Sequence, residues 1–146
     1  MILIPIRAFA LIEVDITRGN LSPLPLAVSP LSIDDKSRKS FEKILSEENI
    51  GSEISVIVEN NLRTSGLFNP LSKEAFLQAP DIANLKPRFE DWNLIKAQAL
   101  ITGKVTYVDE KLRVEFRLWD VLAAKEMMAL ASVSYTHLTL PTNVAV

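Results

Sequence analysis

Acidic side chains in adjacent pairs are the residues of this chain whose type and spacing could do chemistry. Two neighbouring carboxylates can share a proton as an acid and a base, or bind a cation through their oxygens. Four such pairs occur: Asp34-Asp35, Glu47-Glu48, Glu90-Asp91 and Asp109-Glu110. Each pair falls at a predicted turn or helix start, where carboxylates are normally solvated, so we expect no catalytic or metal site.

Residues that could act as a nucleophile or a base are few in this chain. The chain has no cysteine, which excludes disulfides and zinc–thiolate sites, and its one histidine is His137. No phosphate-binding loop forms, because the glycines are widely spaced: Gly19, Gly51, Gly66 and Gly103. The sequence therefore predicts a protein without enzymatic activity, cofactor or metal.

Length and charge predict one globular domain. The chain has 146 residues, 48% of them hydrophobic, and 16 basic against 18 acidic residues give a net charge of −2. The short basic run at residues 36–39 is too small for a nucleic-acid footprint and is expected in a solvated loop. Trp92 and Trp119 could bind a ligand, but core packing is the expectation.

The N-terminus has features of an export signal. Residues 2–6 are apolar but too few to span a bilayer, and Ala8-Phe9-Ala10 fits a small-x-small cleavage site. Residues 1–10 are therefore interpreted as a signal-peptide remnant. Cleavage after Ala10 would remove Arg7 and leave 15 − 18 = −3. An ordinary apolar segment that packs on the domain is the alternative.

The next segment is a candidate for binding a partner. Apolar and polar residues alternate over residues 11–17, which predicts a strand with one buried face. A strand at a sheet edge can pair with a strand of another protein, although pairing inside its own domain remains open. The candidate partner-binding residues are Leu11, Ile12, Glu13, Val14, Asp15, Ile16 and Thr17.

The sequence from residue 24 to residue 131 predicts strands, a main helix and then an antiparallel meander. A strand is expected at 24–29, a mobile loop or short surface helix at 32–43, and an extended piece at 68–70. An apolar stripe predicts the main helix at 50–65, with Gly66 as its left-handed stop. Short helices are expected at 72–77, with Ser72 as cap, and at 89–98, with Phe89, Trp92 and Ile95 inward.

Three strands at 99–107, 112–119 and 126–131 close the body, with a turn at Asp109-Glu110. The fold class predicted is α+β: a small mixed sheet covered on one face by the main helix and the short helices. Residues 132–146 lack charge and resemble translated sequencing-adapter DNA, so a non-native tail is expected there, in which His137 has no function. A threonine-rich terminal strand is the alternative.

The end of the predicted main helix and the residues that follow it resemble a known protein family. Residues 57–71 read Ile-Val-Glu-Asn-Asn-Leu-Arg-Thr-Ser-Gly-Leu-Phe-Asn-Pro-Leu. This resembles the amino-terminal domain of TolB, the periplasmic β-propeller protein of the Tol–Pal system, in which a helix ends in Leu-Arg/Lys-x-Ser-Gly-x-Phe before a proline. Residues 26–31, and 99–105 with 113–120, agree with an early strand and a later hairpin of that family, so the similarity spans residues 11–131.

The resemblance implies a periplasmic scaffold that supports outer-membrane integrity and cell division. A TolA-like inner-membrane protein would bind through residues 11–17. A Pal-like lipoprotein would bind only through the propeller, which the family places after a further helix and beyond this chain. No nucleic acid partner and no membrane-embedded segment are expected.

Two other classes stay open. One is a periplasmic accessory domain of another envelope assembly or secretion system, disfavoured here by the lack of a lipid-attachment cysteine. The other is a nucleic-acid binder, since anticodon-binding domains share the α+β architecture, although the net negative charge disfavours it.

Overall fold

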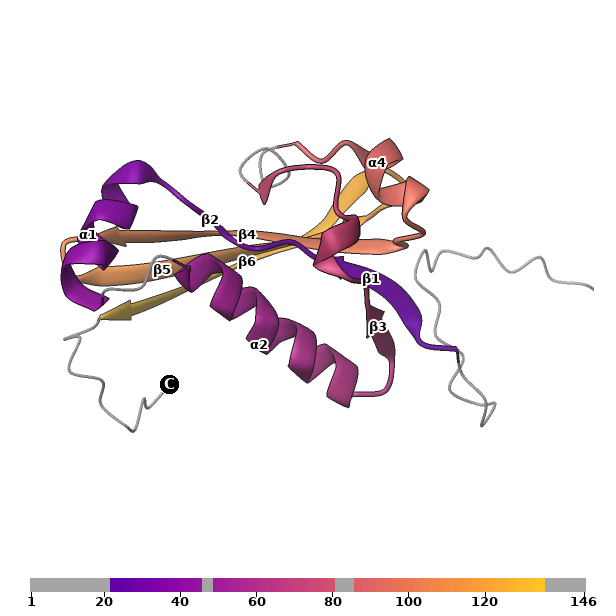
Figure 1. The fold of residues 1–146 in the computed structure, drawn as a ribbon, viewed down its shortest axis with the longest axis horizontal. Coiled ribbons are helices and arrows are strands. Elements are labelled where there is room, and N and C mark those ends of the chain that lie inside the picture. Colours follow the sequence, from indigo (N-terminus) through magenta and orange to yellow (C-terminus); the bar gives the residue numbers. More distant parts are fainter. Residues whose placement is uncertain (1–21, 46–48, 81–85, 136–146) are drawn as a thin grey trace, which may run out of the picture.

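A mixed sheet of six strands forms the centre of the computed structural model, which describes residues 22–45, 49–80 and 86–135 (Figure 1). The strand order is β3-β1-β4-β5-β6, and the short β2 also pairs with β4. The strands are β1 (Leu24–Val28), β2 (Ser32–Ile33), β3 (Phe68–Pro70), β4 (Ala99–Val108), β5 (Lys111–Asp120) and β6 (Lys125–Tyr135).

Parallel and antiparallel pairing divide this sheet in two. β1 runs parallel to both β3 and β4, whereas β4, β5 and β6 form an antiparallel meander. The turn between β4 and β5 is made by Asp109 and Glu110, with φ of 53° and 61°. Two left-handed residues suit a two-residue hairpin, because their twist matches that of the strands. The predicted turn is confirmed.

The main helix is α2 (Ile50–Thr64), as the apolar stripe predicted. Gly66 follows it with φ of 77°, and its N–H donates to the carbonyl of Arg63 at 3.1 Å. Glycine adopts this left-handed conformation without the steric cost that a β-carbon brings. The polar stretch before α2 forms a helix, α1 (Asp35–Leu45), which was one of the two predicted alternatives.

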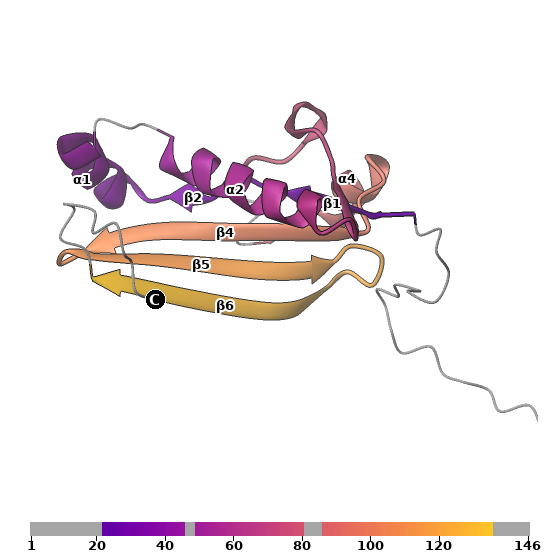
Figure 2. The same ribbon diagram turned by 90° about the horizontal axis from the view of Figure 1, so that it is seen from below.

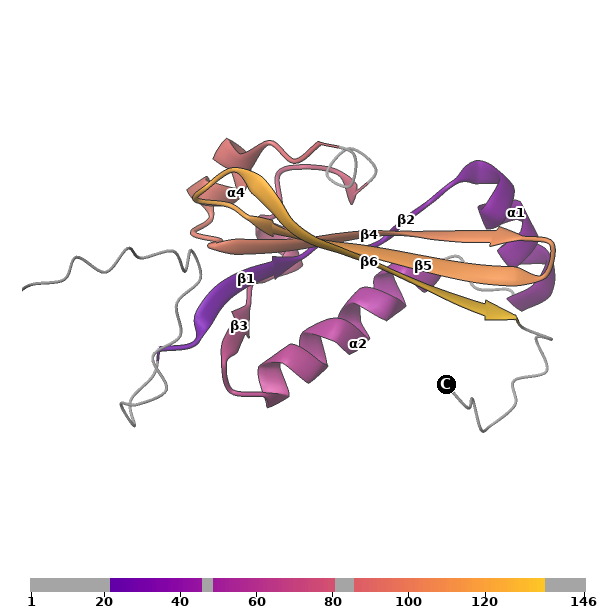
Figure 3. The same cartoon turned by 180° about the vertical axis from the view of Figure 1, so that it is seen from behind.

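Helices pack on both faces of the sheet, which differs from the single covered face expected. On one face α2 packs Val58 and Leu62 against Leu26, Val28 and Ala99. On the other face Trp92, from α4 (Phe89–Leu94), packs with Ala27, Leu100 and Trp119. Figures 1 and 3 show α4 and α2 on opposite sides of the strands. The α+β class and the mixed sheet are as predicted.

The short elements differ from the expected boundaries. The segment after β3 holds one 3₁₀ turn, η1 (Lys73–Ala75), and Ser72 makes no side-chain capping bond. α4 ends at Leu94 because Lys96 takes a φ of 69°, which stops the helix before residue 98. β2 was not predicted. β6 continues to Tyr135, so the first residues of the suspected tail pair with β5.

Candidate interaction surface

The predicted partner-binding strand lies outside the described residues. This applies to all seven of its residues: Leu11, Ile12, Glu13, Val14, Asp15, Ile16 and Thr17. The outermost strands of the described sheet are β3 and β6. β6 is much the longer of the two, so it offers most of the exposed strand edge in the described part of the chain.

The acidic pairs take structural positions wherever the structure describes them. Asp91, in the first turn of α4, lies 2.6 Å from the Nε of Arg88. Asp109 and Glu110 form the hairpin turn and are exposed. Glu47 and Glu48 fall outside the described ranges. Within those ranges no three His, Asp or Glu side chains come together as metal ligands would.

Asp34 caps α1. Its Oδ1 accepts a hydrogen bond from the N–H of Ser37 at 2.7 Å, and its carbonyl accepts from the N–H of Arg38 at 2.8 Å. The Ser37 N–H stabilises the charged carboxylate and so lowers the pKa of Asp34, against a smaller opposing effect of burial; the charges of Lys104 and Lys36 add to the lowering. The carboxylate therefore acts as a helix cap.

Asp120 holds the turn that leads into β6. The side chain is buried, and its Oδ1 accepts from the N–H of Ala123 at 2.8 Å. Its Oδ2 is buried without a hydrogen-bond partner among the described residues. This carboxylate fixes the direction in which the chain leaves β5 and enters β6.

Both tryptophans lie in the core, as expected. The Nε1 of Trp92 donates to the Oε1 of Gln78 at 2.9 Å, and the Nε1 of Trp119 donates to the Oγ1 of Thr102 at 2.8 Å. Each indole thus has its one donor satisfied inside the protein.

The basic run at residues 36–39 lies on α1, with Lys36, Arg38 and Lys39 exposed.

An apolar groove lies between α2 and the outer strands of the sheet. Figure 2 shows that α2 runs beside β4 and leaves β5 and β6 uncovered. The groove has a volume of about 230 Å³. Its lining residues come from α2, β4, β5 and β6: Val58, Ile101, Phe116, Arg117, Leu118, Met128 and Leu130.

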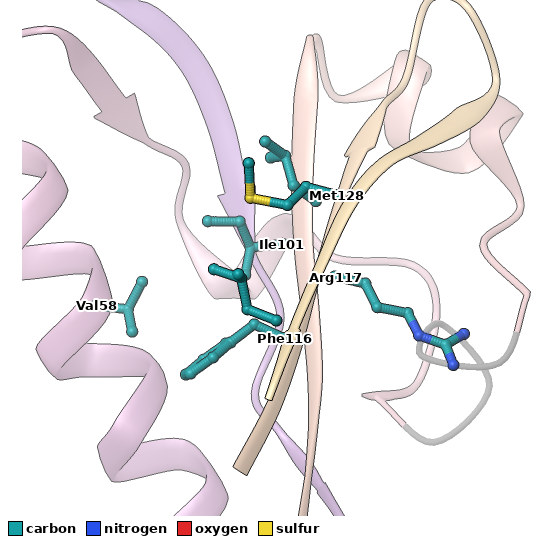
Figure 4. Close-up of a pocket in the computed structure, with 7 residues that line it drawn as sticks. Val58, Ile101, Phe116, Arg117 and Met128 are labelled. Carbon is teal, nitrogen blue, oxygen red and sulfur yellow. The ribbon is translucent and has the colours of Figure 1, made fainter. Parts of the chain in front are cut away.

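The side chains of the groove are arranged by the sheet register. Leu118 pairs with Met128, and Phe116 pairs with Leu130, so four apolar side chains share the face toward α2. In Figure 4 Val58 faces Phe116 across the opening, whereas Arg117 points the other way. Met128 is 50% exposed and Leu130 is 60% exposed. The groove is therefore open along β6.

Sequence reasoning did not single out this groove. The sequence does contain a pattern that points to it. Met128 and Leu130 alternate along β6 and pair with apolar residues of β5. Such alternation predicts a covered face, and only the position of α2 reveals that the β6 part of this face is bare.

Among the described residues, no helix is both long enough and apolar enough to cross a lipid bilayer.

Comparison with known proteins agrees with this fold. The family model of the TolB amino-terminal domain matches residues 12–127. The chain is 78% identical over 142 residues to the Tol-Pal system protein TolB of Pelagibacter ubique (strain HTCC1062). That match covers 97% of this chain and 31% of the relative, so the chain spans about a third of the relative's length.

Solved structures show the same architecture at low identity. TolB from Acinetobacter baumannii superposes with a TM-score of 0.57 and 19% identity, over 80% of this chain and 24% of that one. The C-terminal domain of LpoB from Salmonella enterica gives 0.53 and 12%, over 81% and 87%. These two likenesses concern the fold alone. Because the family model covers most of the sequence, the chain belongs to the TolB amino-terminal domain family.

Proposed function

We propose that this chain is a non-enzymatic protein-interaction domain of the Tol–Pal envelope complex, active in the periplasm. The observation that carries the proposal is the 78% identity over 142 residues with a protein described as a Tol-Pal system component. Since the chain spans 31% of that relative, the proposal concerns the share of the activity that this domain performs. Its role would be to support outer-membrane integrity and cell division.

The partner we propose is a TolA-like inner-membrane protein that pairs with residues 11–17. Ile12, Val14 and Ile16 alternate with polar residues, so one face of the strand can enter an apolar surface while its backbone completes a partner's sheet. The match to the family model begins at residue 12, so residues 12–17 lie within the matched region. A Pal-like lipoprotein is proposed to contact the propeller of the longer relatives.

A strand-breaking substitution tests this partner. Val14→Pro removes a backbone N–H and cannot donate to a ladder, whereas Val14→Ile keeps a β-branched side chain and all backbone donors. The purified chain and both variants are passed over the immobilised periplasmic part of a TolA protein. We expect retention of the chain and of Val14→Ile, and at least about tenfold weaker retention of Val14→Pro, as for the loss of roughly 1.4 kcal/mol.

Two outcomes would contradict the proposal. If the unmodified chain is not retained at all, the domain does not bind TolA by itself. If Val14→Pro is retained as well as the other two proteins, binding occurs but does not use the strand. Circular dichroism of each variant confirms that the fold of residues 22–135 is unchanged, which separates loss of binding from loss of structure.

A further inference from the structure

We draw no further inference here: the strongest candidate, the pocket of about 280 Å³ between Arg38 of α1 and the first turn of α2, rests on a helix N-terminus alone, because none of its described lining residues holds a buried polar side-chain atom that lacks a hydrogen-bond partner.

Discussion

Gly51 and Leu31 lie in backbone contact at the point where α2 meets the sheet. The N–H of Leu31 donates to the carbonyl of Gly51 at 3.1 Å. A β-carbon on Gly51 would lie 2.1 Å from the carbonyl oxygen of Leu31. This contact holds the first turn of α2 against the link between β1 and β2, so glycine is needed here for close approach.

Gly51→Ala should destabilise the domain despite its higher helix propensity. Alanine favours a helix interior by about 1 kcal/mol over glycine. The clash with a backbone oxygen cannot be relieved by a side-chain rotation, so α2 must shift, at a cost of about 1–3 kcal/mol or more. Urea unfolding at fixed protein concentration measures the net loss. Ser52→Ala, in the same helical turn, should change the unfolding free energy by less than about 0.5 kcal/mol.

Gly66→Ala should act through backbone strain alone. Gly66 has a φ of 77°, and no atom lies within 4 Å of the position a β-carbon would take. The expected loss of unfolding free energy is therefore about 1–2 kcal/mol, the cost of a left-handed alanine. Gly66→Asn should lose less, because asparagine tolerates this conformation. Equal losses for the two variants would contradict the role of Gly66 as a left-handed stop.

Local patterns predicted the elements near these glycines, but not which faces the helices cover. The apolar stripe and Gly66 were sufficient to define α2, and alternation defined the meander. The central strands, however, are apolar on both faces, with Ala99 and Ile101 toward α2 and Leu100 toward α4. Alternation cannot identify a strand buried on both sides. The parallel pairing of β1 with β4 joins residues about seventy positions apart, which no local pattern reveals.

Gln78 should stabilise the α4 side of the core through Trp92. Its buried Oε1 accepts from the Trp92 Nε1 and from the N–H of Arg88, both at 2.9 Å, while its Nε2 donates to the carbonyl of Lys86 at 3.1 Å. Gln78→Leu leaves the buried Trp92 donor without an acceptor, so we expect a loss of about 1–3 kcal/mol. Urea unfolding followed by tryptophan fluorescence measures it. Gln98→Leu is the control, at an exposed glutamine.

The contribution of Asp34 should depend on pH. The Ser37 N–H lowers the pKa of Asp34 below its ordinary value of 3.8, so the folded state favours the charged form. The stabilisation is therefore complete above pH 3.8 and is lost as the pH falls through the folded pKa. Asp34→Ala should cost about 0.5–2 kcal/mol near neutral pH, and this difference should shrink in acid.

Asp34→Asn is the matched control for that titration. Asparagine keeps a side-chain oxygen for the Ser37 N–H but carries no titratable group. The difference in unfolding free energy between Asp34→Asn and Asp34→Ala should therefore be independent of pH. A difference between wild type and Asp34→Ala that stays constant below pH 3.8 would show that the charge of Asp34 contributes nothing.

The candidate site was less predictable than the fold. The segment at residues 11–17 was inferred from alternation and family resemblance, and it lies outside the described residues, so its role stays a prediction. The groove was not predicted, because the exposure of its side chains depends on which strands α2 packs against. Met128 and Leu130 have the alternation of a buried strand face, yet both are at least half exposed. Sequence periodicity indicates which residues share a face, but not whether another element covers that face.

A shorter chain of residues 11–131 should be only marginally stable. Truncation after Ala131 removes the β6 partners of Lys111, Leu112, Arg113 and Val114. The exposed Met128 and Leu130 bury too little apolar surface to compensate. In calorimetry we expect a broad transition below about 45 °C, under the usual range for mesophilic domains, and a higher midpoint for the chain of 146 residues. A sharp two-state transition at high temperature for residues 11–131 would mean that β6 up to Ala131 suffices for stability, and that the last four residues of the strand add little.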